Sequence, residues 1–449
     1  MSEPLIGGAA LTLLVHFQVD NSWVRSKTTL EFAMIGVMPP LIRLVGETQV
    51  RTVLRRPHCG RWPSWGRSVP MSGAGAAQLA QAEPARDVGR TLSVLHLVGS
   101  DKFAGTERHV LGLMGELRAL GCEVELACPR RAGLLRREAA EMDFTVRSMV
   151  GVARSKPDII HIHDGAAAVV GWLLARRGQA ALVRTQHFVS PASATRTGVL
   201  GLASRLVHRR LNRRLDGYVC VSEAAARAAR NRRDASGAQV AVIPPGVHLA
   251  SAEQVAQATT GRARSASPIV ASAGRLELER RFDVLLEAIP IVLQTFPDCR
   301  FVIAGRGKAA AELRARAAAV RADAAVEWTG WLPDISPVLS QAHVYVNTWP
   351  DEGFGMATAE AMGYGLPVIV ADSGASPELI EDKISGRVVP ALSTAALAAT
   401  ICELLGDRPR AAAIGVAARE RALARYSARA TGVSMLAFYR QLPSIAGDR

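Results

Sequence analysis

Short hydrophobic runs alternate with longer amphipathic segments along the chain from Thr91 onward. The first run, Leu92–Val98, predicts a buried strand, and the glycine-containing stretch 99–105 predicts a loop after it. The segment that follows predicts a helix that stops at Gly121. Its apolar face comprises Val110, Leu113, Met114 and Leu117. Further strands are predicted at Val124–Cys128, Ile159–Ile162, Ala181–Thr185 and Tyr218–Val221, and the stretch Val240–Val247 closes this half.

The same alternation restarts at Pro268. Strands in this half are predicted at Ile269–Ala273, Phe301–Ala304, Val326–Thr329, Val344–Asn347, Pro367–Ala371 and Arg387–Val389. Because strands that alternate with helices favour parallel sheets covered on both faces, the pattern predicts an α/β chain with two Rossmann-like, doubly wound sheets. Ligands of such sheets bind at the carboxyl ends of the strands, so two facing sheets predict a site in the cleft between them.

These patterns predict an N-terminal domain over 91–248 and a C-terminal domain over 267–425. The Ala/Thr/Ser/Gln-rich stretch 249–266 predicts an interdomain linker. We expect the last segment, 426–449, to be a helix that crosses back to the N-terminal domain.

Residues 1–90 show little clear periodicity and end in an Ala/Gln/Glu-rich linker. Met71 opens a stretch that is typical of a polar N-terminus. We therefore expect translation to begin at Met71, so that a protein starting there folds and works as well as the full chain. A genuine accessory segment over 1–70 is the alternative.

The net charge of +14 indicates an anionic partner: nucleic acid, an anionic membrane surface or a phosphorylated small molecule. Aromatic residues make up only 5% of the chain and no nucleic-acid-binding module is recognisable, which disfavours nucleic acid. The sequence contains no run of about eighteen apolar residues, so it predicts no membrane-spanning helix. Six cysteines without a CxxC pair or zinc spacing are typical of a cytoplasmic protein with reduced thiols.

The most informative stretch, Asp351–Met362, follows a predicted strand and opens a predicted helix. Gly353 and Gly355 let the backbone approach a ligand closely, and the helix start offers free N–H groups and a positive dipole end to an anion. Glu352 precedes the helix and Glu360 lies within it, so the two carboxylates serve different parts of one ligand. Carboxylates accept hydrogen bonds from sugar or ribose hydroxyls.

This stretch resembles the Glu-x7-Glu motif of the retaining glycosyltransferases of GT-B fold, in the large family 4 type. Gly-Phe-Gly lies between the two glutamates and Ala-Met after the second, and the downstream stretches 365–369 and 374–380 are also similar. The resemblance covers about residues 91–440. It implies that Glu352 faces the donor sugar and that Glu360 holds the nucleotide ribose. The other donor-binding residues from this stretch are Gly353, Phe354, Gly355 and Met356.

A second element, Ala273–Leu276, ends a predicted strand and contains Arg275, with Arg280 five residues further on. Cations there neutralise the charge that develops on a departing pyrophosphate. The resembling family has Arg and then Lys-Gly, whereas this chain has Arg280-Arg281 in place of Lys-Gly. Which arginine reaches the phosphate is open, although an ordinary solvated loop is favoured for Arg281. An arginine guanidinium can form two parallel hydrogen bonds with a phosphate, so we expect the protein to keep its function despite the replacement of Lys-Gly.

In the N-terminal half, the stretch 103–109 resembles the family's Gly-Gly-x-Glu-Arg loop, with Ala104 in place of the first glycine. Gly105 would let this loop reach the donor phosphates. His187 falls where the family places a histidine near the transferred sugar, with a merely structural role as the alternative. The resemblance thus makes Glu352, His187 and Arg275 the catalytic candidates.

His161 and His163 end a predicted strand, and both imidazoles lie on one face, an arrangement that can bind a metal. No third or fourth ligand is evident, and the resembling family has a similar histidine-rich strand end without a metal. We therefore expect neither a metal nor a cofactor, with the nucleotide sugar as a substrate.

The resemblance implies a hexosyltransferase (EC 2.4) that retains configuration, needs no metal and favours a UDP-sugar, with a GDP-sugar possible. The acceptor is expected to be a saccharide or a lipid-linked molecule in polysaccharide, lipopolysaccharide or glycolipid synthesis. An epimerase or phosphorylase on the same fold is the alternative. A glycosidase pair fits poorly, because the two glutamates are eight positions apart across a helix start.

The stretch 198–216 predicts a helix with Val207, Leu211 and Leu215 repeating every fourth residue. Its basic residues are Arg205, Arg209, Arg210, Arg213 and Arg214. An ordinary solvated surface helix and a helix that rests on an anionic leaflet are the two interpretations. The second would make the protein peripheral on the cytoplasmic face of the inner membrane.

Overall fold

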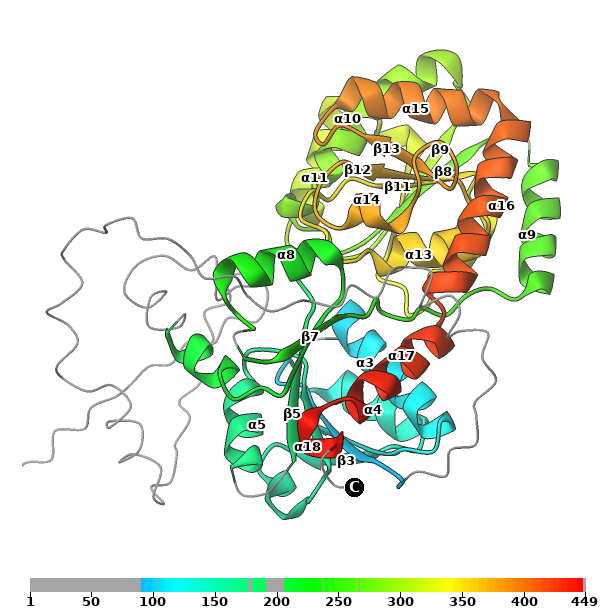
Figure 1. Ribbon diagram of the computed structural model, residues 1–449. Helices are drawn as coiled ribbons and strands as arrows, with labels where there is room; N and C mark the ends of the chain where they lie inside the picture. The colour runs from blue at the N-terminus through cyan, green and yellow to red at the C-terminus, as the bar shows by residue number, and fades with distance from the viewer. Residues whose placement is uncertain are drawn as a thin grey trace, which may run out of the picture. The chain divides into compact units, whose positions relative to one another are not determined.

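The computed structural model describes residues 90–101, 103–176, 180–190, 206–235, 237–265 and 267–446, all of which belong to one compact unit, Gly73–Arg449. The expectations for residues 1–89 lie outside these described residues. Two parallel sheets, each with its own set of helices, make up the described part (Figure 1).

The N-terminal sheet has seven strands in the order β3-β2-β1-β4-β5-β6-β7, and all neighbours are parallel. Its strands are β1 (Ser93–Leu97), β2 (Glu123–Cys128), β3 (Thr145–Ser148), β4 (Ile159–Ile162), β5 (Ala181–Gln186), β6 (Gly217–Cys220) and β7 (Gln239–Val242). The chain moves outward from β1 to β3 and then returns to place β4 on the other side of β1. The strand order therefore reverses between β1 and β4.

The C-terminal sheet has six parallel strands in the order β10-β9-β8-β11-β12-β13. Its strands are β8 (Ile269–Ala273), β9 (Arg300–Ala304), β10 (Val326–Gly330), β11 (Val344–Asn347), β12 (Val368–Ala371) and β13 (Arg387–Val389). The order reverses between β8 and β11, as it does between β1 and β4. Doubly wound sheets bind ligands beside such a reversal, at the carboxyl ends of the strands.

The helices lie between the strands along the chain (Figure 1). Those before β8 are α3 (Gly105–Ala119), α4 (Gly133–Glu141), the 3-10 turn η1 (Gly151–Arg154), α5 (Ala168–Ala175), α8 (Glu223–Arg232) and α9 (Ala252–Arg264). Those after it are η2 (Leu278–Arg280), α10 (Phe282–Thr295), α11 (Ala310–Ala319), η3 (Asp323–Ala325), α12 (Ser336–Gln341), α13 (Met356–Gly363), α14 (Ser376–Leu379), α15 (Thr394–Gly406), α16 (Arg408–Arg425), α17 (Ala428–Arg440) and α18 (Pro443–Ala446).

Both faces of each sheet are buried. Within β1, Leu95 belongs to one hydrophobic cluster, whereas its neighbour Val94 belongs to another. In β8, Ala271 and Val270 divide between two clusters in the same way. Because successive side chains of a strand point to opposite faces, this division shows that helices cover each sheet on both sides. The predicted fold of two doubly wound α/β sheets is confirmed.

Two parts of the chain differ from the expectation. The edge strand β3 was not predicted, because it is short and its side chains are mostly polar or half-buried. The expected linker 249–266 instead contains the helix α9. Its N-terminus carries a capping box, in which Gln254 N–H bonds Ser251 Oγ and Ser251 N–H bonds Gln254 Oε1. Ala258 is buried and α9 packs on α12, so this stretch is part of the second domain's helical layer.

The chain passes between the two sheets twice, and the two passages are paired. Val247 N–H donates to Tyr426 O at 2.9 Å, and Val247 forms an isolated parallel bridge with Ser427. After the second passage α17 lies beside α3 (Figure 1). The C-terminal helix α17 is therefore packed into the N-terminal domain.

No described helix is long and apolar enough to cross a membrane. Of the stretch 198–216, residues 198–205, including Arg205, lie outside the described part, and 206–212 is helical. Leu215 is buried and Leu211 half-buried, but Val207 is 46% exposed. The helix therefore does not bury the whole apolar stripe that its spacing suggests.

Candidate active site

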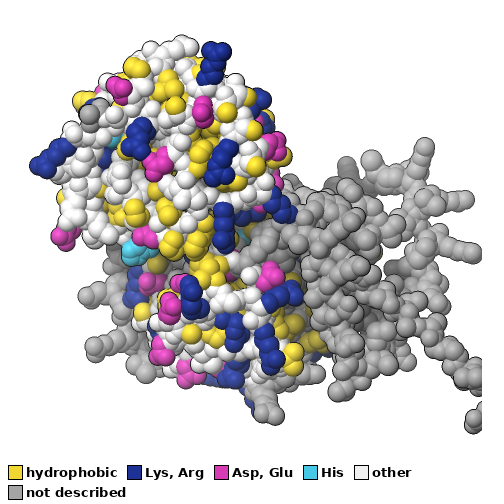
Figure 2. Space-filling view, turned by 180° about the vertical axis from the view of Figure 1, so that it is seen from behind, with side chains coloured by type: hydrophobic (Ala, Val, Ile, Leu, Met, Phe, Trp, Pro, Cys, Tyr) yellow, Lys and Arg dark blue, Asp and Glu magenta, His cyan; other side chains and the backbone are white. Residues whose placement is uncertain are grey.

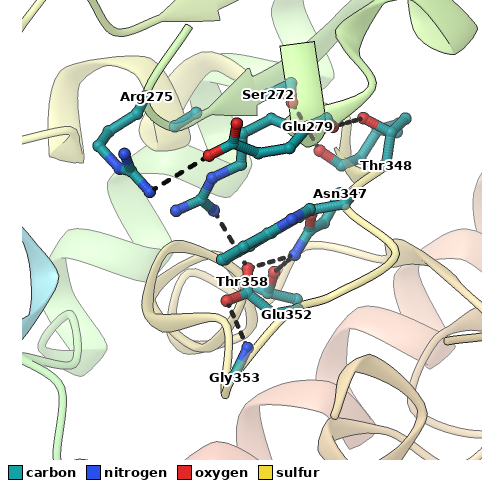
Figure 3. Close-up of polar contacts among 12 residues, drawn as sticks. Ser272, Arg275, Glu279, Asn347, Thr348, Glu352, Gly353 and Thr358 are labelled. Atoms are coloured by element: carbon teal, nitrogen blue, oxygen red, sulfur yellow. Dashed lines mark hydrogen bonds and ion pairs between the residues drawn. The ribbon is translucent and has the colours of Figure 1, made fainter. Parts of the chain in front are cut away.

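The loop between β11 and α13 holds Glu352 at the reversal point of the C-terminal sheet (Figure 3). Its Oε2 accepts a hydrogen bond from Asn347 Nδ2 at 3.2 Å, and its Oε1 accepts one from Gly353 N–H at 3.1 Å. Asn347 also donates to Thr358 Oγ1 at 3.2 Å. The end of β11 and the first turn of α13 thus fix the carboxylate, which is only 8% exposed.

Arg280 lies beside this carboxylate, with Nη1 3.5 Å from Glu352 Oε2. Its guanidinium carbon lies 3.4 Å from the centroid of the Trp349 ring, a cation–π contact. Burial lowers the pKa of Arg280, and the charge of Glu352 opposes that shift. No partner for Arg280 Nε occurs among the residues with described positions. The guanidinium is therefore held by its neighbours, while its buried Nε–H has no hydrogen-bond partner in the described structure.

Arg281 is directed elsewhere. Its backbone has a φ of 57°, and its guanidinium contacts the Asp283 carboxylate from Nε at 3.0 Å and from Nη2 at 2.8 Å. Of the two adjacent arginines, Arg280 is the one that lies against Glu352.

Arg275 follows β8, at the neighbouring strand end (Figure 3). Its Nη2 lies 3.9 Å from Glu279 Oε1, and its side chain is 25% exposed. The positive charge of Arg275 contributes to lowering the pKa of Arg280. Two cations held this close favour the binding of an anion between or beside them.

Glu360 lies within α13, and burial raises its pKa to about 7. The positive charge of Arg108, on α3 of the N-terminal domain, opposes this increase, while Asp334 adds to it. Near neutral pH this carboxyl is therefore partly protonated. The protonated form can donate one hydrogen bond, whereas the carboxylate can only accept.

The side chain of Phe354 points into the core and not toward the candidate site. Its side chain is 6% exposed and makes an edge-on contact with Tyr426, with ring centroids 5.3 Å apart. The aromatic ring therefore anchors the loop in the core, and only its backbone is available to a donor. Gly355, with a φ of 99°, caps α13 in a conformation that glycine adopts readily.

The loop that precedes α3 meets this motif from the N-terminal domain. A Cβ added at Gly105 would lie 3.3 Å from Met356 Sδ. Ala104, in place of the family's glycine, has an extended backbone with φ −147°, which any residue adopts, and its N–H donates to Glu107 Oε2 at 2.9 Å. The substitution is therefore compatible with the loop.

His187, after β5, approaches the same motif through its backbone. A Cβ at Gly353 would lie 2.2 Å from His187 O, so only glycine fits there. Ser190 Oγ donates to Asp351 Oδ1 at 3.4 Å nearby. Glu378 makes another connection between the two domains. Its carboxylate accepts hydrogen bonds from the N–H groups of Glu223 and Ala224 at 2.7 and 2.6 Å, at the start of α8.

Behind His187 lies a cluster of buried histidines at the reversal point of the N-terminal sheet. It comprises His96, His109, His161 and His163. Ring nitrogens of three of them, His96, His161 and His163, lie within 4.8 Å of one another, so a third potential metal ligand exists that the sequence did not reveal. His161, however, is engaged at both nitrogens, by Tyr439 Oη at 2.6 Å and by Thr185 Oγ1 at 2.7 Å.

Two family models match the chain across these two domains. The model "Glycosyltransferase Family 4" matches residues 103–251, and "Glycosyl transferases group 1" matches residues 267–407. The chain belongs to glycosyltransferase family 4. It is a glycosyltransferase of hexosyl groups, as the Glu-x7-Glu resemblance predicted.

Relatives of this glycosyltransferase include the phosphatidyl-myo-inositol mannosyltransferase of Mycobacterium leprae, 27% identical over 350 residues, which are 72% of this chain and 90% of the relative. The GDP-mannose-dependent alpha-(1-6)-phosphatidylinositol monomannoside mannosyltransferase of Mycolicibacterium smegmatis is 28% identical over 312 residues, 65% of this chain and 79% of the relative. Among solved structures, Anabaena HepE in complex with UDP and glucose is similar with a TM-score of 0.68 and 19% identity, covering 78% of this chain and all of HepE. The expected GT-B fold is confirmed.

Several contacts of this glycosyltransferase's candidate site were not foreseen from the sequence. Asn347 and Thr358 flank the motif, and their role in fixing Glu352 could have been suspected from their positions at a strand end and a helix start. Trp349, which stacks on Arg280, lies 69 positions after it in the chain, and no local pattern links the two residues. His96 lies inside an apolar run that periodicity assigns to the core.

Proposed function

We propose that this glycosyltransferase moves mannose from GDP-mannose to a hydroxyl of a lipid-linked acceptor, with retention of configuration and without a metal. The observation that carries the proposal is the arrangement of Arg280 against Glu352 at the start of α13. The names of the two mannosyltransferase relatives support mannose and a phosphatidylinositol-type acceptor. A UDP-sugar, the donor favoured by the sequence resemblance, is the second candidate.

In this mechanism Arg275, Arg280 and the N–H groups at the start of α13 stabilise the nucleoside diphosphate as it departs. The bond between the sugar's anomeric carbon and the phosphate oxygen breaks, and the sugar passes through an oxocarbenium-like state. The acceptor hydroxyl forms its bond on the same face and loses its proton to the departing phosphate. Glu352 accepts hydrogen bonds from the sugar hydroxyls, and Glu360 binds the ribose.

A donor panel tests this proposal. The full-length protein is incubated with GDP-mannose, UDP-glucose or UDP-GlcNAc, with and without phosphatidylinositol vesicles, and free nucleotide and glycosylated lipid are measured. We expect acceptor-dependent GDP release, an α-linked product and unchanged turnover after treatment with EDTA. Turnover with UDP-sugars alone would contradict the mannose donor, a β-linked product would contradict retention, and loss of turnover in EDTA would contradict metal independence.

The segment 206–214 supports an association with an anionic membrane. Arg209, Arg210, Arg213 and Arg214 are exposed, and beside them Leu206 and Val207 are 56% and 46% exposed. Exposed apolar and basic side chains on one short segment are typical of docking at a lipid headgroup region. On the face shown in Figure 2, by contrast, basic side chains are scattered among acidic and apolar ones. We therefore propose a peripheral protein at an anionic leaflet.

Sedimentation with vesicles tests this docking. Each basic residue near an anionic leaflet contributes about 1 kcal/mol, so removing two weakens binding about thirtyfold at low salt. We expect that loss in Arg210→Ser/Arg213→Ser. The matched control, Arg314→Ser/Arg408→Ser, removes two exposed arginines of the other domain and keeps the parent's binding. Equal binding of neutral and anionic vesicles would contradict the proposal.

A further inference from the structure

Three of the buried histidines form a hydrogen-bonded series that ends at His187. His96 Nδ1 lies 3.0 Å from His163 Nε2, and His163 Nδ1 lies 3.3 Å from His187 Nε2. The parallel register of β1 beside β4 and of β4 beside β5 brings the three rings together at adjacent strand ends. His163 thus contacts a neighbour through each of its two ring nitrogens, whereas His96 and His187 each use one.

All three rings are neutral at physiological pH. Burial lowers the pKa of His96 to about 3, and it lowers the pKa values of His163 and His187 well below their usual range. Neighbouring imidazoles, with Arg184 in the case of His187, lower these pKa values further. A neutral imidazole has one N–H and one lone pair, so each bond in the series has one donor and one acceptor.

Only two proton arrangements satisfy both bonds. In the first, all three rings carry their proton on Nδ1, and each donates toward His187. In the second, all three carry it on Nε2, and each donates toward His96. The two arrangements differ at the ends of the series, where His96 Nε2 and His187 Nδ1 have no partner in the series.

The His96 end favours the first arrangement. His96 is 0% exposed, and its Nε2 has no hydrogen-bond partner within the described structure. The second arrangement would bury an N–H without an acceptor at this atom, whereas the first leaves only an unused lone pair. Orphaned buried N–H groups are the rarer defect in proteins. At the other end His187 is half-buried, and its Nδ1 is not among the buried side-chain nitrogens that lack a partner in the described structure.

We propose that His96 and His163 are positioning residues that hold the His187 imidazole in its Nδ1-protonated tautomer. His187 then offers an N–H to an oxygen lone pair of the donor sugar and has no basic nitrogen on that side. Its contribution is to orient the sugar beside the Glu352–Gly353 loop, not to accept the acceptor's proton. This last step rests on the proposed function, but the tautomer does not.

The tautomer can be measured in the protein without substrate. In the full-length protein labelled with 15N-histidine, long-range 1H–15N correlation distinguishes a protonated Nδ1 from a protonated Nε2 in each ring. We expect protonated Nδ1 in His96, His163 and His187. Protonated Nε2 in His187 of the parent protein overturns the proposal by itself, whatever the variants do.

Variants at His96 then test the direction of control. His96→Phe keeps the ring volume but removes the donor to His163, so His187 should show averaged tautomers. In His96→Asn the amide Nδ2 stands near the position of Nδ1 and should restore the protonated Nδ1 of His187. His109→Phe is the matched control: His109 is buried and its ring lies edge-on to His187 at 5.4 Å, but no hydrogen bond joins them. It should leave the tautomer unchanged.

Steady-state kinetics with the donor separate positioning from chemistry. For His96→Phe we expect the donor KM to rise about tenfold, the equivalent of one hydrogen bond, with kcat within about threefold of the parent. His96→Asn should recover most of the loss. An unchanged tautomer and KM in a folded His96→Phe protein would overturn the proposal. The expected tautomers without turnover of any nucleotide sugar would instead overturn the proposed function and leave the histidine series standing.

Discussion

The two sheets of this glycosyltransferase reverse their strand order in the same way, yet the side chains at the two reversal points differ in charge. The C-terminal sheet presents Arg275, Arg280 and Glu352, together with the start of α13. The N-terminal sheet presents imidazoles that burial keeps neutral. In the proposed function, this difference divides the site into a half that binds a charged leaving group and a half that orients neutral hydroxyls. The predictions below test this division.

The largest effect is expected for Glu352→Gln, which removes the negative charge that contacts Arg280. Loss of a group that acts on the transition state reduces kcat about a thousandfold, and we expect a fall of that order in transfer while circular dichroism shows a folded protein. Glu381→Gln, at an exposed position outside the site, is the control. A fully active Glu352→Gln enzyme would contradict the assignment.

Arg280→Ala should lower kcat/KM for the donor about a hundredfold, because it removes a cation held against Glu352 and Trp349. The adjacent Arg281 provides the control, since it pairs with Asp283 instead. Arg281→Asn suits the left-handed backbone at that position and should stay within twofold of the parent. Arg275→Ala should have an intermediate effect, about tenfold. Equal losses at Arg280 and Arg281 would refute a specific phosphate site.

Gly353→Ala tests the contact between the two halves, because the added Cβ would lie 2.2 Å from His187 O and must displace a backbone. A displacement of this kind near reacting groups costs up to about a hundredfold, and we expect about thirtyfold in kcat/KM. Gly105→Ala meets only the flexible Met356 side chain, at 3.3 Å, and should cost threefold or less. A Gly353→Ala enzyme as active as Gly105→Ala would show that this close contact is not used.

The last prediction concerns the stability of the Glu360→Gln variant. Burial raises the folded-state pKa of Glu360 to about 7, above its value in the unfolded chain, so ionisation costs stability increasingly as pH rises from about 4.5 to 7. The uncharged glutamine avoids this cost. We expect the variant to be about 3 kcal/mol more stable than the parent at pH 8 and about equal to it at pH 4, in urea unfolding. Its transfer activity should nevertheless be mostly lost.

A stability difference between Glu360→Gln and the parent that does not depend on pH would contradict the buried carboxyl. A stable variant with full transfer activity would contradict the ribose role.

Most strands were predictable because they are short apolar runs: Ile159–Ile162 and Ile269–Ala273 coincide with β4 and β8. The glycine-rich strand-to-helix loop that holds Glu352 is a local pattern, whereas the roles predicted for Glu352 and Arg280 depend on the family resemblance. The edge strand β3 was missed because an edge strand can be polar. The helix α9 was missed because its composition suggested a linker, although the Ser251-x-x-Gln254 capping pattern was readable.

The histidine series was not predictable from local patterns. His96, His163 and His187 lie on or just after three separate strands, and only the strand order and register bring them together. A histidine inside an apolar run has no periodic signal of its own. The contact of Glu378 with the start of α8 depends in the same way on tertiary structure, because it joins elements about 150 residues apart.

The paired passages at Val247 and Tyr426 limit how the two domains can move. A single flexible connecting segment would let one domain rotate about every axis. Here the two connecting segments are joined by a backbone hydrogen bond, and a Cβ at Gly246 would lie 2.5 Å from Ala428 Cα. Two connecting segments in such close contact resist twisting about each other more than they resist bending in the same direction. We therefore expect any rotation of one domain relative to the other to be restricted mainly to a single axis, which runs through the segment that contains Gly246.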